Sequence, residues 1–353
     1  MSNKLDKPFP AKGLAVFQKG GRFDPFAFDR RALRADDVAV KIHYAGICHS
    51  DLHAVRDNWA GEFPIVPGHE IMGEVTGIGQ DVEDFKVGDS VLIGTIVDSC
   101  RTCDPCERYI EPYCREFPTL TYDGIDRIDK TRTRGGYSDF YVSDKRFVHH
   151  LPKGLDPARA APLLCAGITV YSPLKHWEIG PGHTIAVVGI GGLGHLAVKF
   201  ARALGAHVVA ITRTQAKADE ALKLGAHETV LSTDAEAMER QAYRFDFILD
   251  TVSTRYPMDP IIKALKLDGT LCSLGIPDSF DFTPVLLTMG RRRLTSSGVG
   301  GTKETKEMLA FCAKHSIEPD VEIVHPSKLD ETFDRLAQGD VRYRFVMDLR
   351  SGI

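Results

Sequence analysis

The sequence predicts a two-domain protein, in which a mostly antiparallel, barrel-like β domain is followed by an α/β domain with a doubly wound parallel sheet. Three observations support this fold class. The 353 residues are too many for one hydrophobic core but suit two domains. Short β-type runs separated by Gly and Asp turns occupy the first 150 residues. From about Gly182 onward, strand-like and helix-like segments alternate, which is typical of a parallel sheet.

The β domain is indicated by closely spaced runs rich in Val, Ile and Tyr. These runs are residues 36–46, 71–80, 87–94 and 135–142. A cysteine-rich segment and the polar stretch 123–134 interrupt this pattern and are expected to be excursions from the domain.

The α/β domain begins with a buried strand and a Gly-rich turn at residues 184–194. Apolar side chains then recur at helical spacing up to Leu204, and Gly205 provides the stop. Further strands are predicted at residues 207–212, 228–231, 245–250 and 269–275, with a helix at 216–226. A late amphipathic helix, 303–315, and a closing strand, 344–349, complete the pattern.

Composition and charge narrow the class of protein. The chain is 43% hydrophobic and 26% charged, which is typical of a soluble globular protein. Its net charge of -4 gives no reason to expect a nucleic acid or an anionic membrane as partner. The first residues lack the apolar run of a secretory signal, and no stretch is long enough to span a bilayer. We therefore expect a cytoplasmic protein with reduced thiols.

One segment, residues 99–114, holds four of the eight cysteines at C-x2-C-x2-C-x7-C spacing. In a reducing compartment, clustered thiols are typical of a metal site rather than of disulfides, and the usual ending of an iron–sulfur run is missing. Four thiolates form the closed shell of structural zinc, which leaves no position for substrate. The sequence thus favours structural zinc over an iron–sulfur cluster or disulfides, and the expected ligands are Cys100, Cys103, Cys106 and Cys114.

The Gly-rich turn predicts a dinucleotide site. Gly189, Gly191 and Gly194 form G-x-G-x-x-G between a strand and a helix, the context that this motif requires. The glycines let the backbone approach a pyrophosphate, and the helix N-terminus offers unpaired N–H groups. We expect the whole turn, including Gly192 and Leu193, to contact the cofactor.

The end of the next strand favours NADP over NAD. An NAD site places Asp or Glu here to bond the ribose hydroxyl. This chain instead has hydroxyls and cations, which suit a 2'-phosphate. The residues concerned are Thr212, Arg213, Thr214 and Lys217. A solvated loop with ordinary surface charges is the alternative.

A second metal site is suggested by Cys48, His69 and Cys165. Singly, each could be a buried structural residue. Together with a dinucleotide site, two cysteines and a histidine match the open zinc shell of an alcohol dehydrogenase, whose fourth position is free for water or a substrate oxygen.

These motifs resemble the zinc-dependent medium-chain dehydrogenase/reductase family, and within it the NADP-dependent, cinnamyl-alcohol-dehydrogenase-like branch. The resemblance covers essentially the whole chain and rests on GICHSDLH, PGHEIMGEVTGIG, FKVGDSVLIG, the four-cysteine segment, LLCAGITVYSPL and GIGGLGHLAVKFA. It implies a GroES-like catalytic domain with the zinc lobe and a Rossmann cofactor domain. The expected bounds are residues 1–156 for the catalytic domain, 157–297 for the cofactor domain, and 298–353 for a return segment that completes the catalytic domain.

The resemblance also assigns site residues. It implies Glu70 as an alternating zinc ligand, although from the sequence alone Glu70 could instead be a carboxylate that supports the ligands. It implies that Ser50 takes the alcohol proton and passes it through the ribose toward His53. Ser50 could also cap a helix that begins near Asp51. Further cofactor contacts are implied at Thr169, Ser297 and Val299.

Several other residues carry weaker signals. Thr119 stands near a position where plant members of the branch often have Trp, which weakens any claim to cinnamyl aldehydes as substrates. Trp59 is either a pocket wall or an exposed aromatic residue, and His49 is a neighbour of the cofactor phosphate or a surface residue. The three arginines 291–293 are interpreted as a solvated surface. Cys272 and Cys312 are interpreted as structural.

The resulting prediction is reversible hydride transfer between NADP(H) and a primary alcohol or its aldehyde. The substrate is expected to be aromatic or to belong to a broad range of alcohols. Two zinc ions per chain and a homodimeric assembly are also expected. A small-molecule alcohol or aldehyde is the expected partner, with neither nucleic acid nor membrane. Two alternatives remain: a related reductase acting on C=C or C=N bonds with a non-catalytic zinc, and a non-enzymatic NADPH-binding protein.

Overall fold

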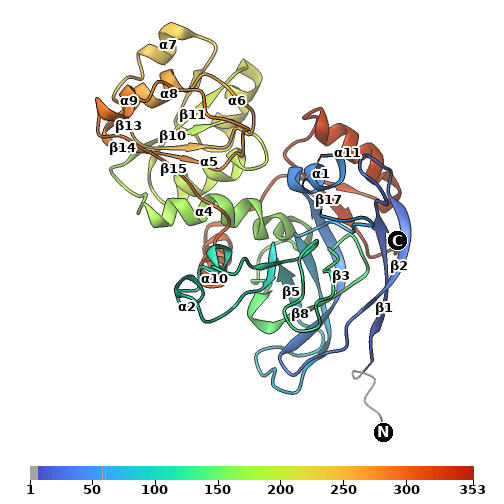
Figure 1. The fold of residues 1–353 in the computed structure, drawn as a ribbon. Coiled ribbons are helices and arrows are strands. Elements are labelled where there is room, and N and C mark those ends of the chain that lie inside the picture. The colour runs from blue at the N-terminus through green and yellow to red at the C-terminus, as the bar shows by residue number, and fades with distance from the viewer. Residues whose placement is uncertain (1–6, 58, 60) are drawn as a thin grey trace. The chain divides into compact units, whose positions relative to one another are not determined.

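The computed structural model describes residues 7–57, 59 and 61–353, which form two compact units (Figure 1). Unit 1 comprises residues up to Cys165 together with Gly300–Ile353, and unit 2 comprises Ala166–Val299. In the described part of the chain, no helix is long and apolar enough to cross a membrane.

Unit 1 is built mainly on antiparallel strands. Its strands are β1 (Phe9–Ala15), β2 (Asp24–Arg30), β3 (Asp37–Ile47), β4 (Ile71–Ile78), β5 (Ser90–Ile93), β6 (Ile96–Asp98), β7 (Thr119–Leu120), β8 (Phe140–Asp144), β9 (Val148–His150), β16 (Val321–Val324) and β17 (Arg344–Asp348). The main sheet has the order β16-β17-β3-β4-β5-β9, and β8 pairs with β3. The four runs expected as strands overlap β3, β4, β5 and β8, although β8 begins five residues into its run, so strands in these regions are confirmed.

The helices of unit 1 are short apart from two near the C-terminus. They are α1 (His49–Arg56), α2 (Asp104–Glu107), α3 (Pro157–Ala160), α10 (Thr302–His315) and α11 (Leu329–Ala337). Single 3-10 turns occur at Glu111–Tyr113, Lys145–Phe147, Ala161–Leu164 and Pro326–Lys328.

The core of unit 1 joins the two stretches of chain that form it. In β4, buried Val75 lies between exposed Glu74 and Thr76, because successive side chains of a strand point to opposite faces. Buried residues of β3 and β4 cluster with Phe333 of α11 and Phe345 of β17. The closing strand is therefore a central element of this sheet, where it pairs antiparallel with β3.

Unit 2 contains a six-stranded sheet in which every pairing is parallel. Its strands are β10 (Thr184–Val188), β11 (His207–Thr212), β12 (Glu228–Leu231), β13 (Phe245–Asp250), β14 (Leu265–Ser273) and β15 (Arg293–Ser296). The order β12-β11-β10-β13-β14-β15 is that of the Rossmann fold, which confirms the predicted fold class of this unit.

Helices connect and surround the strands of this sheet (Figure 1). They are α4 (Ala166–His176), α5 (Gly194–Ala203), α6 (Gln215–Lys223), α7 (Ala235–Glu239), α8 (Asp259–Lys263) and α9 (Val285–Thr288). Gly205 follows α5 with a φ of 92°, a left-handed conformation that suits the predicted helix stop.

The interpretation of the three arginines as a solvated surface is wrong for Arg292. Arg291 is exposed and pairs with Asp268, but Arg292 is buried. Its guanidinium donates to the main-chain oxygens of Lys263, Leu265 and Leu286. The number of charges in this segment does not reveal which arginine is buried, because two of the three acceptors lie 27 and 29 residues away in the chain.

Candidate functional site

Four side chains predicted as ligands of a catalytic zinc converge in unit 1. Cys48 follows β3, His69 and Glu70 precede β4, and Cys165 follows the 3-10 turn Ala161–Leu164. The ligand atoms of these four residues all lie within 4.8 Å of one another. The sulfurs of Cys48 and Cys165 are 3.9 Å apart, close to the roughly 3.8 Å between two thiolates on one tetrahedral zinc.

A buried carboxylate orients the histidine of this cluster. Asp51, in the first turn of α1, contacts Nδ1 of His69 at 3.0 Å. It also accepts hydrogen bonds from the Cys48 amide at 3.0 Å and from the Tyr137 hydroxyl at 2.9 Å. Because Nδ1 is occupied, Nε2 of His69 is the ring nitrogen available to a metal ion.

Glu70 is fully buried and is held by a cation from the other end of the chain. Its Oε1 forms an ion pair with Arg344 in β17, whereas its Oε2 has no hydrogen-bond partner among the described residues. A side chain at Gly46 would place Cβ 1.9 Å from Oε2, so only glycine leaves room for the carboxylate. Burial raises the pKa of Glu70 to about 7, against the opposing effect of Arg344.

The charge balance of the cluster suits a divalent cation. The pKa of the Cys48 thiol lies well below its ordinary value, because the Cys165 thiol donates a hydrogen bond to it and Arg344 lies nearby. A thiolate is the form of cysteine that binds metal. Two sulfurs, one imidazole nitrogen and one carboxylate oxygen therefore form a donor set that fits zinc. Of the two Glu70 oxygens, Oε1 lies 3.9 Å from Nε2 of His69.

The two residues predicted for proton transfer lie on α1. Ser50 Oγ is 3.5 Å from Nε2 of His69. His53 is partly exposed, with its Nδ1 2.5 Å from Asp57 and its ring 4.7 Å from that of Trp59. The alternative that Ser50 caps the helix is wrong, because α1 begins at His49 and its N-cap is Cys48. Trp59 is 49% exposed.

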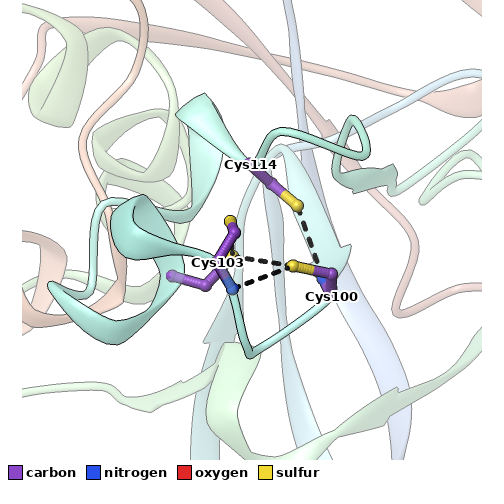
Figure 2. Close-up of side chains that lie close together, drawn as sticks. Cys100, Cys103 and Cys114 are labelled. Carbon is purple, nitrogen blue, oxygen red and sulfur yellow. Dashed lines mark hydrogen bonds between the residues drawn. The ribbon is translucent and has the colours of Figure 1, made fainter.

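The second cysteine cluster forms a lobe around α2 (Figure 2). Its four sulfurs also lie within 4.8 Å of one another, with separations of 3.4 Å for Cys103–Cys106 and 3.9 Å for Cys100–Cys106. These distances match a tetrahedral shell of four thiolates and exceed the roughly 2 Å of a disulfide. Main-chain N–H groups of Thr102 and Cys103 lower the pKa of Cys100 to about 6, which favours the metal-binding thiolate.

The three glycines of the G-x-G-x-x-G turn differ in their surroundings. Gly189 adopts a φ of 84°, and its N–H donates to Ile211 in β11. A Cβ at Gly194 would lie 1.9 Å from the Gly189 oxygen, whereas a Cβ at Gly191 would meet nothing within 4 Å. The turn is therefore tight at Gly189, closely packed at Gly194, and open to an approaching group at Gly191, as a pyrophosphate site requires.

The residues predicted to bind a 2'-phosphate lie at the end of β11 and the start of α6. Thr212 is buried, and Arg213 is exposed and makes no ion pair within the described residues. Thr214 is the N-cap of α6 and accepts a hydrogen bond from the Lys217 amide, while Lys217 Nζ is 3.2 Å from Glu220. The structure brings these four residues together without a carboxylate at the end of the strand.

The remaining predicted cofactor contacts lie in other parts of unit 2. Thr169 is buried in α4, and Ser297 and Val299 follow β15. Three other residues considered in the sequence are buried. Thr119 lies in β7, Cys272 in β14 and Cys312 in α10 of unit 1.

Comparison with known proteins decides the family. The model of the alcohol dehydrogenase GroES-like domain matches residues 34–153, and the model of the zinc-binding dehydrogenase matches residues 192–314. The NADP-dependent alcohol dehydrogenase C 1 of Mycolicibacterium smegmatis is 48% identical over 91% of this chain and 93% of its own. The chain belongs to the zinc-dependent medium-chain dehydrogenase/reductase family.

Solved structures of family members share the whole fold. The cinnamyl alcohol dehydrogenase SbCAD4 of Sorghum bicolor gives a TM-score of 0.94 at 40% identity and covers 98% of this chain and 99% of its own. A CAD of Helicobacter pylori in complex with NADP(H) gives 0.91 at 37% identity, covering 98% of this chain and 100% of its own. The predicted resemblance, including its cinnamyl-alcohol-dehydrogenase-like branch and GroES-like domain, is confirmed.

Sequence reasoning missed residues that support the zinc ligands. Asp51 lies inside the motif GICHSDLH, but the motif does not show that its carboxylate contacts His69. Arg344 is 274 residues from Glu70, and Tyr137 is 86 residues from Asp51. No local pattern could have identified Arg344, because the pairing of β17 with β3 brings it to the site.

Proposed function

We propose that this protein is an alcohol dehydrogenase that catalyses reversible hydride transfer between NADP(H) and a primary alcohol or its aldehyde. The observation that supports this most strongly is the convergence of Cys48, His69, Cys165 and the Glu70 carboxylate in one cluster. Unit 1 then acts as the catalytic domain and unit 2 as the cofactor domain.

When bound, zinc supplies a Lewis acid for the substrate oxygen, and the nicotinamide accepts or donates the hydride. Cys48, His69 and Cys165 would hold the metal ion, and Asp51 fixes the ring of His69 for this purpose. The Glu70 carboxylate would be a further ligand of the same ion when the substrate is absent.

Proton transfer is assigned to residues of α1. In oxidation, Ser50 Oγ would accept the proton of the substrate hydroxyl and give up its own proton, which His53 would receive. The cofactor ribose, when bound, would supply the hydroxyl groups between these two residues. His53 is partly exposed and can release the proton to water. Each alcohol thus loses one hydride to the cofactor and one proton to solvent, and reduction of the aldehyde reverses both transfers.

Selection of NADP is assigned to the cationic end of β11. Arg213 has no ion pair in the described residues and can direct a planar fork of donors at a phosphate, and Lys217 adds a point charge. Thr212 stands where an NAD-specific site would have a carboxylate.

The test is kcat/KM for NADPH and NADH with a panel of aromatic, aliphatic and branched aldehydes. Wild type should prefer NADPH. Arg213→Ala should weaken NADP binding by about tenfold to a hundredfold, because a charge-assisted bond contributes roughly 1.5–3 kcal/mol, while NAD binding barely changes. Thr212→Asp should shift the preference further toward NADH. A wild-type preference for NADH, or reduction of C=C bonds alone, would contradict the proposal.

We also propose a cytoplasmic homodimer that pairs through unit 2. β15 is at the edge of the six-stranded sheet, and nearby Ile276, Val285 and Met289 are more than half exposed. An unpaired edge strand beside exposed apolar side chains is a typical interface. Light scattering should give the mass of two chains for wild type and of one chain for Ser296→Pro, which removes an amide on the open edge of β15. The eight free thiols suit a reducing compartment.

A further inference from the structure

A third segment lies at the same edge of the unit 2 sheet as the glycine turn and the end of β11. Residues Asp250, Thr251 and Val252 stand where β13 ends, and Asp250 is the register partner of Val188 at the end of β10. Ligands of doubly wound sheets bind at the carboxyl ends of strands where the strand order reverses, which here is between β10 and β13. None of the motifs that predict the cofactor site includes this segment.

Thr251 is bonded directly to the glycine turn. Its hydroxyl is 2.9 Å from the Gly189 oxygen and 3.0 Å from the Val188 oxygen, and its amide donates to the Val188 oxygen at 3.0 Å. The same hydroxyl would lie only 3.0 Å from a Cβ at Gly189, so it occupies the space that the missing side chain leaves.

These bonds fix one peptide plane of the turn. The Gly189 oxygen is held between the Thr251 hydroxyl and Gly194, the first residue of α5. Because the C=O and N–H groups of a trans peptide point in opposite directions, holding this oxygen also sets the direction of the Ile190 N–H group. The path of the chain from Gly189 to the start of α5 therefore depends on the position of Thr251.

Thr251 is itself held in place by Asp250. The Asp250 carboxylate is buried and accepts hydrogen bonds from the Val252 amide at 3.0 Å and from the Tyr256 hydroxyl at 2.8 Å. Its main-chain oxygen accepts a bond from the Leu274 amide, which follows β14, at 2.7 Å. Thr251 therefore lies on a segment that is held by hydrogen bonds from its own loop and from the loop that follows β14.

We propose that Thr251 is a positioning residue for the cofactor, which holds the glycine turn in the shape that receives the pyrophosphate. This proposal rests on the proposed function, because it assumes that the turn binds NADP. It goes further by assigning the geometry of the turn to a hydroxyl group 62 residues away in the chain.

The test compares Thr251→Val, which keeps the shape of the side chain but removes the hydroxyl, with Thr251→Ser, which retains it. Binding is measured by calorimetry for NADP, for 2'-phospho-ADP-ribose, which carries the pyrophosphate but no nicotinamide, and for adenosine 2'-monophosphate, which has no pyrophosphate. Thr251→Val should bind the first two ligands about tenfold more weakly and the third unchanged, since one hydrogen bond to the turn is lost. Thr251→Ser should bind all three like wild type.

Thr251→Ala provides a second hydroxyl-free variant, should Thr251→Val fail to fold. Equal weakening for all three ligands would overturn the proposal, since it would indicate general loosening of unit 2. Unchanged binding of the two pyrophosphate ligands in both hydroxyl-free variants would also overturn it. Failure of wild type to bind any of the three would be a different result, because the proposed function would then fall with it.

Discussion

The Glu70 carboxylate combines two functions in one buried side chain. One oxygen is paired with Arg344, which offsets the cost of burying the charge, and the other has no partner among the described residues. Gly46 leaves the room that this second oxygen requires. We interpret Glu70 as a potential metal ligand whose position is fixed by its ion pair with Arg344.

The proton path can be tested at Ser50. Ser50→Ala should lower kcat by about a hundredfold to ten-thousandfold, the usual range for general acid–base catalysis, with little effect on NADPH affinity. Ser50→Thr, which keeps a hydroxyl, should retain most of the activity. His53→Ala should have a milder effect, because water can replace an exposed proton acceptor. An unchanged kcat in Ser50→Ala would show that water reaches the substrate oxygen directly.

At the level of elements, periodicity predicted most of the fold. Strands β10 to β14 of unit 2 and the helices α5, α6 and α10 carry clear patterns of apolar spacing, and the structure confirms them. The elements that were not predicted include the β1–β2 hairpin, β15 and α11. β2 alternates exposed and half-buried residues with few aliphatic side chains. α11 does carry an amphipathic pattern, because its buried residues Leu329, Phe333 and Leu336 recur at helical spacing, so this helix could have been predicted.

The site was predictable only in part. Ligands within short motifs, such as Cys48 and His69, could be recognised from the sequence. Their supports could not, because Arg344 and Thr251 reach the sites only through strand pairing over long distances in the chain. Local spacing contains no information about such pairings.

Two glycine variants test the turn between β10 and α5. Gly191→Ala should fold with an unchanged melting temperature, because its Cβ meets nothing within 4 Å, yet it should bind NADP at least tenfold more weakly if the pyrophosphate approaches here. Gly194→Ala should lower the melting temperature, because its Cβ would lie 1.9 Å from the Gly189 oxygen. Calorimetry and thermal unfolding measure both effects. Normal NADP binding by Gly191→Ala would place the pyrophosphate elsewhere.

His149 in β9 predicts a pH dependence of stability. Burial lowers its pKa to about 4, with smaller effects from Lys306 and His150. As the pH falls, this histidine is protonated in the unfolded chain before it is protonated in the folded protein. Its contribution to stability is therefore fully present above about pH 6.5 and is lost as the pH falls toward 4. The free energy of unfolding, measured with urea in the presence of zinc, should fall between pH 7 and pH 5 in wild type. This fall should be about 1–2 kcal/mol smaller in His149→Gln. Identical pH profiles for the two proteins would contradict this assignment.

For the whole molecule, the metal sites have distinct expected functions. The lobe cluster is a closed set of four thiols, so its zinc should stabilise the fold of unit 1. The Cys48 cluster includes a carboxylate that can leave, so its zinc should serve catalysis. Loss of one zinc should therefore have different consequences at the two sites, and two zinc ions per chain are expected.

The most direct test measures zinc content and NADPH-dependent aldehyde reduction together in Cys165→Ser, with Cys103→Ser as the matched variant in the lobe. Wild type should contain two zinc ions per chain. Cys165→Ser should retain the lobe zinc and the fold but lose the second zinc and turnover. In Cys103→Ser, the primary effects should be loss of the lobe zinc and of stability. Two zinc ions with wild-type turnover in Cys165→Ser would contradict the assignment of Cys48, His69 and Cys165 as the catalytic metal site.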